Sequence, residues 1–184
     1  MNLPNKITMF RIILAFIMLV LLVFPFYAFD YEFPKYLIAG KVLVDTKYII
    51  AGCIFVVAAF TDFLDGYIAR KKNLVTNFGK TMDAIADKVL VNGLLIILAY
   101  DGFISVIIPV VIITRDIFTD SLKMVIATSG EVVGASITGK IKTIFVMVGL
   151  ALILFYNIPF ELVNIRVADI LLLIGVVMSV VSAV

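Results

Sequence analysis

Long apolar stretches separated by short polar segments dominate this sequence. A helix that crosses the hydrocarbon core of a membrane needs about 20 largely apolar residues. Six stretches approach that length, at residues 8–29, 48–70, 81–100, 103–126, 137–156 and 167–184. Hydrophobic residues make up 64% of the chain, whereas a soluble domain is about half apolar. The sequence therefore predicts an all-α, polytopic membrane protein with six transmembrane helices, built as one domain over residues 1–184.

The positive charges in the sequence predict how such a protein is oriented. One side of the membrane would carry Lys6, Arg11, Arg70, Lys71, Lys72, Lys80, Lys140 and Lys142. The other side would carry Lys35, Lys41, Lys47 and Arg166, diluted by Asp30, Glu32, Asp45, Asp101 and Glu161. Lys and Arg are biased to the cytoplasmic side. We therefore expect both termini to be cytoplasmic, with the first helix following a short polar lead at residues 2–6.

Four aspartates, Asp62, Asp65, Asp83 and Asp87, occur at the ends of two neighbouring apolar stretches. A carboxylate near hydrocarbon is costly and marks a candidate functional site. Asp62 and Asp65 are three residues apart, and Asp83 and Asp87 are four apart, so each pair lies on one face of its helix. The segment between the two helices is short, which makes them antiparallel neighbours. All four carboxylates can then converge near the cytoplasmic surface.

Converging carboxylates require a cation, since they would otherwise repel one another. The chain has no histidine, so metal binding and acid–base chemistry fall to the carboxylates. Hard divalent metals are the natural partners of an all-oxygen site, and a pair of such ions is typical of phosphoryl chemistry. Gly66 and Gly79 would allow close approach of a ligand, and Arg70 and Lys80 could meet its anionic groups. A structural ion-pair network and a metal or proton transporter are the alternatives.

These residues form the pattern D-x-x-D-G-x-x-A-R, eight further residues, and G-x-x-x-D-x-x-x-D. The pattern resembles the signature of the CDP-alcohol phosphotransferase family. Every defined position matches, namely Asp62, Asp65, Gly66, Ala69, Arg70, Gly79, Asp83 and Asp87. The resemblance implies a six-helix membrane fold and a reaction in which an alcohol hydroxyl attacks the β-phosphorus of a CDP-linked lipid and CMP leaves.

The resemblance also implies roles for individual residues. Two divalent ions, Mg²⁺ or Mn²⁺, would be held by Asp62, Asp65, Asp83 and Asp87, and Asp87 would also act as the general base. Contacts to the CDP group would come from Asn5, Thr8, Asp62, Gly66, Arg70, Thr76 and Gly79. A homodimer is the expected assembly.

Other segments resemble one bacterial branch of the family, the phosphatidylglycerophosphate synthases. They are residues 2–11, 73–80 and 139–143. This implies an enzyme of the bacterial inner membrane that uses CDP-diacylglycerol and glycerol-3-phosphate. Inositol phosphate, serine or phosphatidylglycerol as the acceptor remain alternatives.

An acceptor that is itself a phosphate ester needs cations near the metals. The candidates are Arg115, Lys123, Lys140 and Lys142. Lys140 and Lys142 could instead serve only the charge bias of membrane topology. The branch usually shows R-E and a later Arg where this chain has Arg115-Asp116 and Lys123. Adjacent helical residues point in different directions, so we do not expect a simple Arg115–Asp116 pair.

Overall fold

The computed structural model describes residues 3–71, 77–128 and 137–182. Within these ranges the chain forms six α-helices: α1 (Leu3–Val23), α2 (Thr46–Lys71), α3 (Asn77–Tyr100), α4 (Ile107–Thr128), α5 (Ile137–Leu154) and α6 (Val167–Val181). Two short 3₁₀ helices, η1 (Phe26–Phe29) and η2 (Phe160–Val163), and two strands, β1 (Lys35–Ile38) and β2 (Val42–Asp45), complete the described fold. The predicted helical class and the six predicted helices are confirmed.

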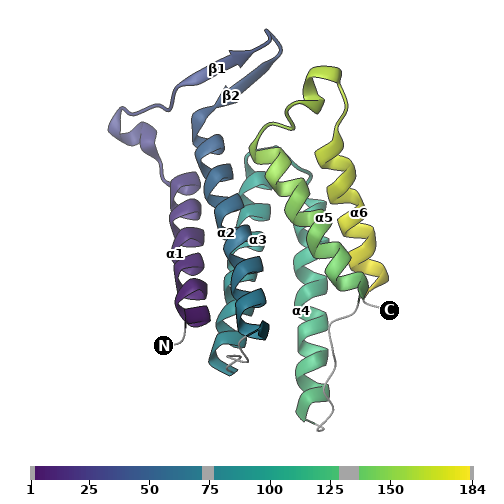
Figure 1. Ribbon diagram of the computed structural model, residues 1–184. Helices are drawn as coiled ribbons and strands as arrows, with labels where there is room; N and C mark the ends of the chain where they lie inside the picture. Colours follow the sequence, from purple (N-terminus) through teal and green to yellow (C-terminus); the bar gives the residue numbers. More distant parts are fainter. Residues whose placement is uncertain (1–2, 72–76, 129–136, 183–184) are drawn as a thin grey trace.

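The helices run up and down one bundle, with both chain ends at the same end (Figure 1). Helix α1 packs against α2 and α3, α5 packs most extensively against α6, and α2 also meets α5. Helix α4 contacts α3 and α6. The ends of α2, α4 and α6 and the starts of α1, α3 and α5 therefore gather at the end that holds the termini. We call this the catalytic end, after the aspartates of the expected active site that lie toward it, and the opposite end the outer end.

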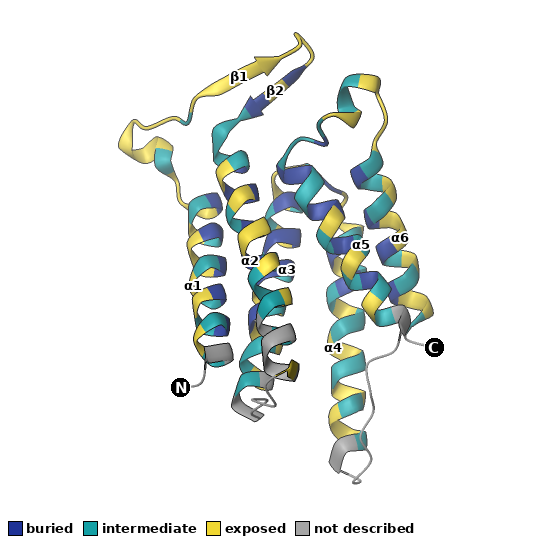
Figure 2. Ribbon diagram, in the orientation of Figure 1, coloured by how far each residue is buried: buried dark blue, intermediate teal, exposed yellow. Residues whose placement is uncertain are grey.

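The surface of the bundle is apolar. Exposed large hydrophobic side chains occur on every helix, among them Phe16, Phe60, Ile96, Phe118, Ile144 and Leu173, and the outward helix faces are largely exposed (Figure 2). Soluble monomers rarely expose large contiguous apolar patches. Among the described residues, Asn5–Val23 and Thr46–Leu64 are long and apolar enough to cross a membrane. These features support the predicted membrane location.

The core of the bundle consists of apolar stripes at helical spacing. Helix α1 buries Ala15, Met18 and Leu22, and α2 buries Ala51, Phe55 and Ala58. Between α5 and α6 the backbones approach closely at two glycines. An added Cβ would lie 2.9 Å from Leu172 at Gly149 and 2.7 Å from Val146 at Gly175. Small residues of this kind are what close helix packing in membranes requires.

The segment between α1 and α2 differs from the prediction. Helix α1 begins at Leu3 and ends at Val23, not at residues 8 and 29. Pro4 fits the first helical turn, which needs no backbone donor, whereas Pro25 cannot continue a helix. The chain then forms an antiparallel hairpin that pairs Ile38 with Val42. The left-handed backbone at Ala39 and Gly40 allows its tight reversal.

Candidate active site

A buried arginine connects two of the four aspartates. Arg11 of α1 donates from Nη1 to Oδ1 of Asp62 on α2, and from Nη2 to Oδ1 of Asp83 on α3. Nη2 also lies 3.3 Å from the backbone carbonyl oxygen of Asp83. The Arg11 side chain is 1% exposed, while those of Asp62 and Asp83 are 39% and 49% exposed. We call these three residues the carboxylate centre.

The helical repeat places these charges together. Arg11 continues the buried stripe of α1 through Ala15 and Met18, at spacings of four and three residues. Asp62 follows Ala58 by four residues on α2, and Asp83 precedes Ala86 by three on α3. Each of the three core stripes therefore has a charged residue at the catalytic end. Packing the apolar parts of the stripes brings their charged ends into contact.

The other two aspartates, Asp65 and Asp87, are not part of the carboxylate centre. Asp65 lies on α2, but its side chain is outside the part of the structure that is described. Asp87 lies on α3, one turn after Asp83, within electrostatic range of Arg11, Asp83, Lys142 and Asp116. Among the described side chains, no three carboxylates form a group that could hold a metal ion. The structure thus brings Asp62 and Asp83 together, and the convergence of all four stays a prediction.

Three of the residues expected to contact CDP lie one helical turn from the carboxylate centre. Thr8 is buried on α1, one turn before Arg11. Gly66 follows Asp62 by one turn on α2, and Gly79 precedes Asp83 by one turn on α3. Asn5 is a partly buried residue of the first turns of α1. Thr76 and the side chain of Arg70 fall outside the described part of the chain.

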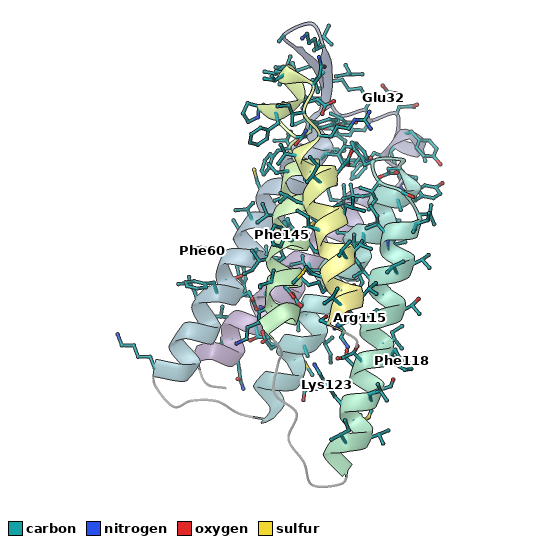
Figure 3. The ribbon with its side chains drawn as sticks, turned by 90° about the vertical axis from the view of Figure 1, so that its right-hand side faces the viewer. Glu32, Phe60, Arg115, Phe118, Lys123 and Phe145 are labelled. Atoms are coloured by element: carbon teal, nitrogen blue, oxygen red, sulfur yellow. The ribbon has the colours of Figure 1, made fainter. Side chains whose placement is uncertain are left out.

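Two of the cations expected to bind the acceptor phosphate share a carboxylate. Lys142 of α5 donates to both carboxylate oxygens of Asp116 on α4, at 2.6 Å each. Arg115 donates from Nη1 to Oδ1 of Asp116 at 3.1 Å and from Nη2 to the hydroxyl of Ser182. We call Arg115, Asp116 and Lys142 the basic cluster. Figure 3 shows Arg115 beside the end of α6, where Ser182 lies.

The expectation that Arg115 and Asp116 do not pair was wrong. Their Cα–Cβ bonds diverge as neighbouring helical positions must, but the long arginine side chain bends far enough to reach the carboxylate. Lys123 lies farther along α4 (Figure 3) and Lys140 is exposed on α5. Among the described residues, no hydrogen bond or ion pair joins Lys123 or Lys140 to the basic cluster. The structure therefore brings together two of the four predicted cations.

Sequence reasoning missed the roles of Arg11 and Asp116. Arg11 was counted as a cytoplasmic charge and as part of the resembling segment 2–11, and Asp116 as the neighbour of Arg115; neither was given a partner. A signal was available for both, since each is an ionisable residue inside an apolar stretch and therefore needs a named partner. Their main partners are far away in sequence, 51 and 72 residues for Arg11 and 26 for Asp116. Local spacing could not identify them.

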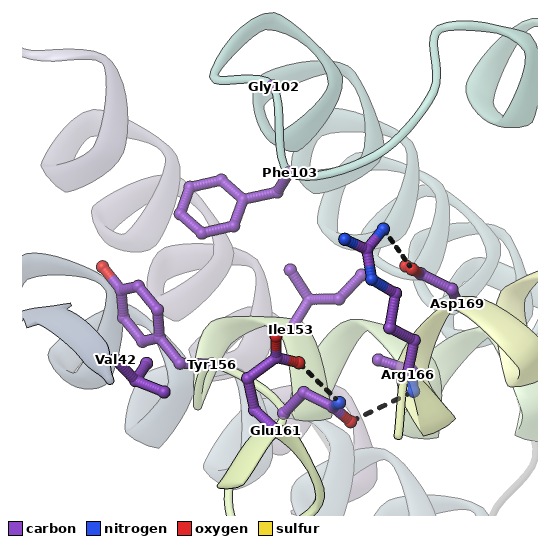
Figure 4. A pocket seen from close by; sticks show the side chains of 10 residues that line it. Val42, Gly102, Phe103, Ile153, Tyr156, Glu161, Arg166 and Asp169 are labelled. Carbon is purple, nitrogen blue, oxygen red and sulfur yellow. Dashed lines mark hydrogen bonds and ion pairs between the residues drawn. The ribbon is translucent and has the colours of Figure 1, made fainter. Parts of the chain in front are cut away.

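A pocket of about 310 Å³ lies at the outer end, away from both charged groups. Phe103, Tyr156 and Glu161 are among the residues that surround it (Figure 4). The buried Asn157 side chain donates to Glu161 and to the Ile165 carbonyl oxygen, and accepts from the Ala168 N–H. No predicted site residue lines this pocket, whose polar groups organise the connection between α5 and α6.

Comparisons with known proteins show the family of this chain. The model of the CDP-alcohol phosphatidyltransferase family matches residues 1–181. The CDP-diacylglycerol–glycerol-3-phosphate 3-phosphatidyltransferase of Bacillus subtilis is 41% identical over 181 residues, which cover 98% of this chain and 91% of the relative. Proteins of the same name from Rickettsia typhi and Mycoplasma pneumoniae are 34% and 33% identical. The Rickettsia typhi match covers 83% of this chain and 76% of the relative, and the Mycoplasma pneumoniae match covers 81% and 66%.

Proposed function

Because this chain belongs to the CDP-alcohol phosphatidyltransferase family, we propose that it transfers the phosphatidyl group of CDP-diacylglycerol to glycerol-3-phosphate. The products are CMP and phosphatidylglycerophosphate, and the reaction is a step of phospholipid biosynthesis. The observation that carries the proposal is the 41% identity to the Bacillus subtilis enzyme, which extends over 98% of this chain. The two opposite charge groups at the catalytic end provide the chemistry that this reaction needs.

The family uses divalent metal ions, and the carboxylate centre fits such an ion. Asp62 and Asp83 present hard oxygen donors from facing helices, and both already contact one cationic group, the Arg11 guanidinium. We propose that Asp62, Asp65, Asp83 and Asp87 hold two ions, Mg²⁺ or Mn²⁺. When bound, such ions would neutralise the diphosphate and stabilise charge on the attacking and leaving oxygens.

Asp87 is the proposed general base. It is within electrostatic range of both the carboxylate centre and the basic cluster, which is where donor and acceptor must meet. The acceptor hydroxyl oxygen forms a bond to the β-phosphorus, and the bond from that phosphorus to the CMP oxygen breaks. The hydroxyl proton passes to the Asp87 carboxylate, and CMP leaves with the bonding electrons. A base must lie within hydrogen-bond reach of the proton that it takes.

The remaining site residues position the two substrates. The proposed CDP contacts are Asn5, Thr8, Asp62, Gly66, Arg70, Thr76 and Gly79. Lys142 and Arg115, supported by Lys123 and Lys140, would bind the phosphate of glycerol-3-phosphate. Asp116 marks the anion position, because one carboxylate already accepts hydrogen bonds from both Lys142 and Arg115. Charge-assisted bonds of this type are the strong ones in phosphate recognition.

The proposed setting is the bacterial inner membrane. We propose that all six helices span it, with the catalytic end and both termini in the cytoplasm, and that the protein acts as a homodimer. The family membership, the exposed apolar helix faces and the positive charge at the catalytic end support this orientation.

The test is a CMP-release assay with purified full-length protein in detergent micelles containing CDP-diacylglycerol and Mn²⁺ or Mg²⁺. Glycerol-3-phosphate, inositol phosphate, serine and phosphatidylglycerol are supplied one at a time. We expect release with glycerol-3-phosphate to exceed all others. Faster release with another alcohol would reassign the acceptor. No release with any of them, together with metal flux in liposomes, would replace the transferase by a transporter.

A further inference from the structure

The position of Arg11 assigns it a function of its own. Its side chain is 1% exposed and lies on the buried side of Asp62 and Asp83, whose carboxylates are partly open. It contacts the Oδ1 atom of each carboxylate, so one guanidinium connects α1, α2 and α3 at the level of the proposed metal site. Nothing else in the described part of the chain forms an ion pair with either carboxylate.

The contacts of Arg11 show what holds it in place. A guanidinium stays charged and offers a planar fork of donors that suits carboxylates. Its Nε is buried and, among the described residues, has no hydrogen-bond partner. Leaving a buried donor unsatisfied costs free energy, so the position of Arg11 is not that of a fully hydrogen-bonded structural arginine. The two carboxylates fix its place.

We propose that Arg11 is the resident counter-ion of the carboxylate centre: it holds Asp62 and Asp83 together in the metal-free protein, and a bound divalent ion takes over that charge. Arg11 is thereby a positioning residue, since it acts on the reaction through the two aspartates. The proposal rests on the metal site of the proposed function. It adds that the site is assembled, and electrically compensated, before any metal arrives.

This role has a consequence that a purely structural ion pair lacks. Without Arg11 the two carboxylates repel each other in the metal-free protein, because both are negatively charged and both lie within reach of the same guanidinium. A bound divalent ion removes that repulsion. In a variant without Arg11, the ion also has no guanidinium to compete with for the same carboxylate oxygens. A ligand that binds only the folded state stabilises it more when it binds more tightly. Loss of the Arg11 charge should therefore lower stability mainly when metal is absent.

The experiment measures the thermal unfolding midpoint of the full-length protein in detergent micelles, with EDTA and with saturating MnCl₂. For Arg11→Gln we expect a lower midpoint in EDTA and a midpoint near wild type in Mn²⁺. The Mn²⁺-induced shift should then exceed the wild-type shift by about 3 °C or more. The Mn²⁺ dissociation constant, measured by calorimetry, should fall about tenfold, which corresponds to roughly 1.4 kcal/mol.

Arg11→Lys tests the same idea in a chain that keeps its charge, and serves if Arg11→Gln does not fold. An ammonium cannot reproduce the fork, so its Mn²⁺-induced shift should lie between those of wild type and Arg11→Gln. Arg166→Gln, which removes an ion pair at the outer end, is the matched control and should keep the wild-type shift. An Mn²⁺-induced shift in both Arg11 variants that equals or falls below wild type overturns the inference. No shift in the wild type overturns the metal site itself.

Discussion

Two groups of charged residues at the catalytic end are opposite in composition. In the carboxylate centre, two acids, Asp62 and Asp83, share one base, Arg11. In the basic cluster, two bases, Arg115 and Lys142, share one acid, Asp116. Each group is thus left with one unit of charge in excess, negative in the first and positive in the second. An excess charge attracts ligands of the opposite sign, so the first is suited to a metal cation and the second to a phosphate.

The two groups also differ in how they are tied to the fold. Arg11 joins three helices through partners 51 and 72 residues away. Among the described residues, Asp116 joins α4 to α5, and one of its partners is the adjacent Arg115. The basic cluster reaches α6 through Ser182, at the end of that helix. Damage to the carboxylate centre should therefore affect both helix assembly and catalysis. Damage to the basic cluster should affect mainly the binding of the acceptor.

The largest effect on activity is expected at Asp87, which lies within electrostatic range of the carboxylate centre and the basic cluster. Asp87→Asn removes the proton acceptor and should lower kcat for CMP release by about 10³-fold, within the usual range for a general base. The KM for glycerol-3-phosphate should change little. The unfolding midpoint of the variant in EDTA is the control for folding, because Asp87 is also a proposed metal ligand. Near-normal turnover would remove Asp87 from the role of base.

The next effect separates the two groups directly. Lys142→Gln should raise the KM for glycerol-3-phosphate by about 10- to 100-fold and leave the KM for CDP-diacylglycerol near wild type. The reason is that a lost charged hydrogen bond to a phosphate weakens ground and transition states alike. Steady-state kinetics with each substrate varied in turn provides the measurement. If both KM values rose together, Lys142 would belong to the fold and not to the acceptor site.

A smaller effect is expected from Asp116→Asn, the mirror image of Arg11→Gln. The neutral amide leaves Arg115 and Lys142 uncompensated, so the unfolding midpoint should fall by about 3 °C for each kcal/mol lost. Added glycerol-3-phosphate replaces the missing anion and should stabilise this variant more than wild type. A thermal shift series with glycerol-3-phosphate measures this. Equal stabilisation of variant and wild type would show that Asp116 and the phosphate occupy different places.

Much of the fold could be predicted because long apolar runs leave few alternatives to helix. The runs at 48–70 and 81–100 correspond closely to α2 and α3. The β1–β2 hairpin was missed, since its residues lie between the first two predicted helices and were assigned to no element. Its signal, alternating burial at Val42 and Val44 after a turn glycine, spans only four residues. Short strands are the elements that sequence patterns identify least well.

The positions of the aspartates along the helices could be predicted, but the pairing of the charged groups could not. The sequence predicted that the aspartates lie near the end of one helix and the start of the next, and the structure has them near the end of α2 and the start of α3. This was possible because helical periodicity is a local property of the sequence. The partner of Asp62 is Arg11 on α1. The sequence pattern does not show which helices pack against each other, so it could not identify this pair. The same limit applies to Asp116, whose bond to Lys142 depends on how α4 meets α5. The prediction that Arg115 and Asp116 do not pair failed because the arginine side chain is flexible. The direction of its Cα–Cβ bond does not determine where the guanidinium group lies.

The smallest effect is expected at the outer end, where Arg166 and Asp169 form an ion pair of the ordinary exposed kind. Their nitrogen and oxygen atoms are 3.8 Å apart, and the side chains are 78% and 48% exposed. Exposed pairs contribute about 0–1 kcal/mol because solvent screens them. Arg166→Gln should therefore shift the unfolding midpoint by no more than about 3 °C and leave both KM values unchanged. A loss of stability as large as that of Arg11→Gln in EDTA would mean that burial is not what distinguishes the carboxylate centre, and the contrast between buried and exposed ion pairs would no longer hold.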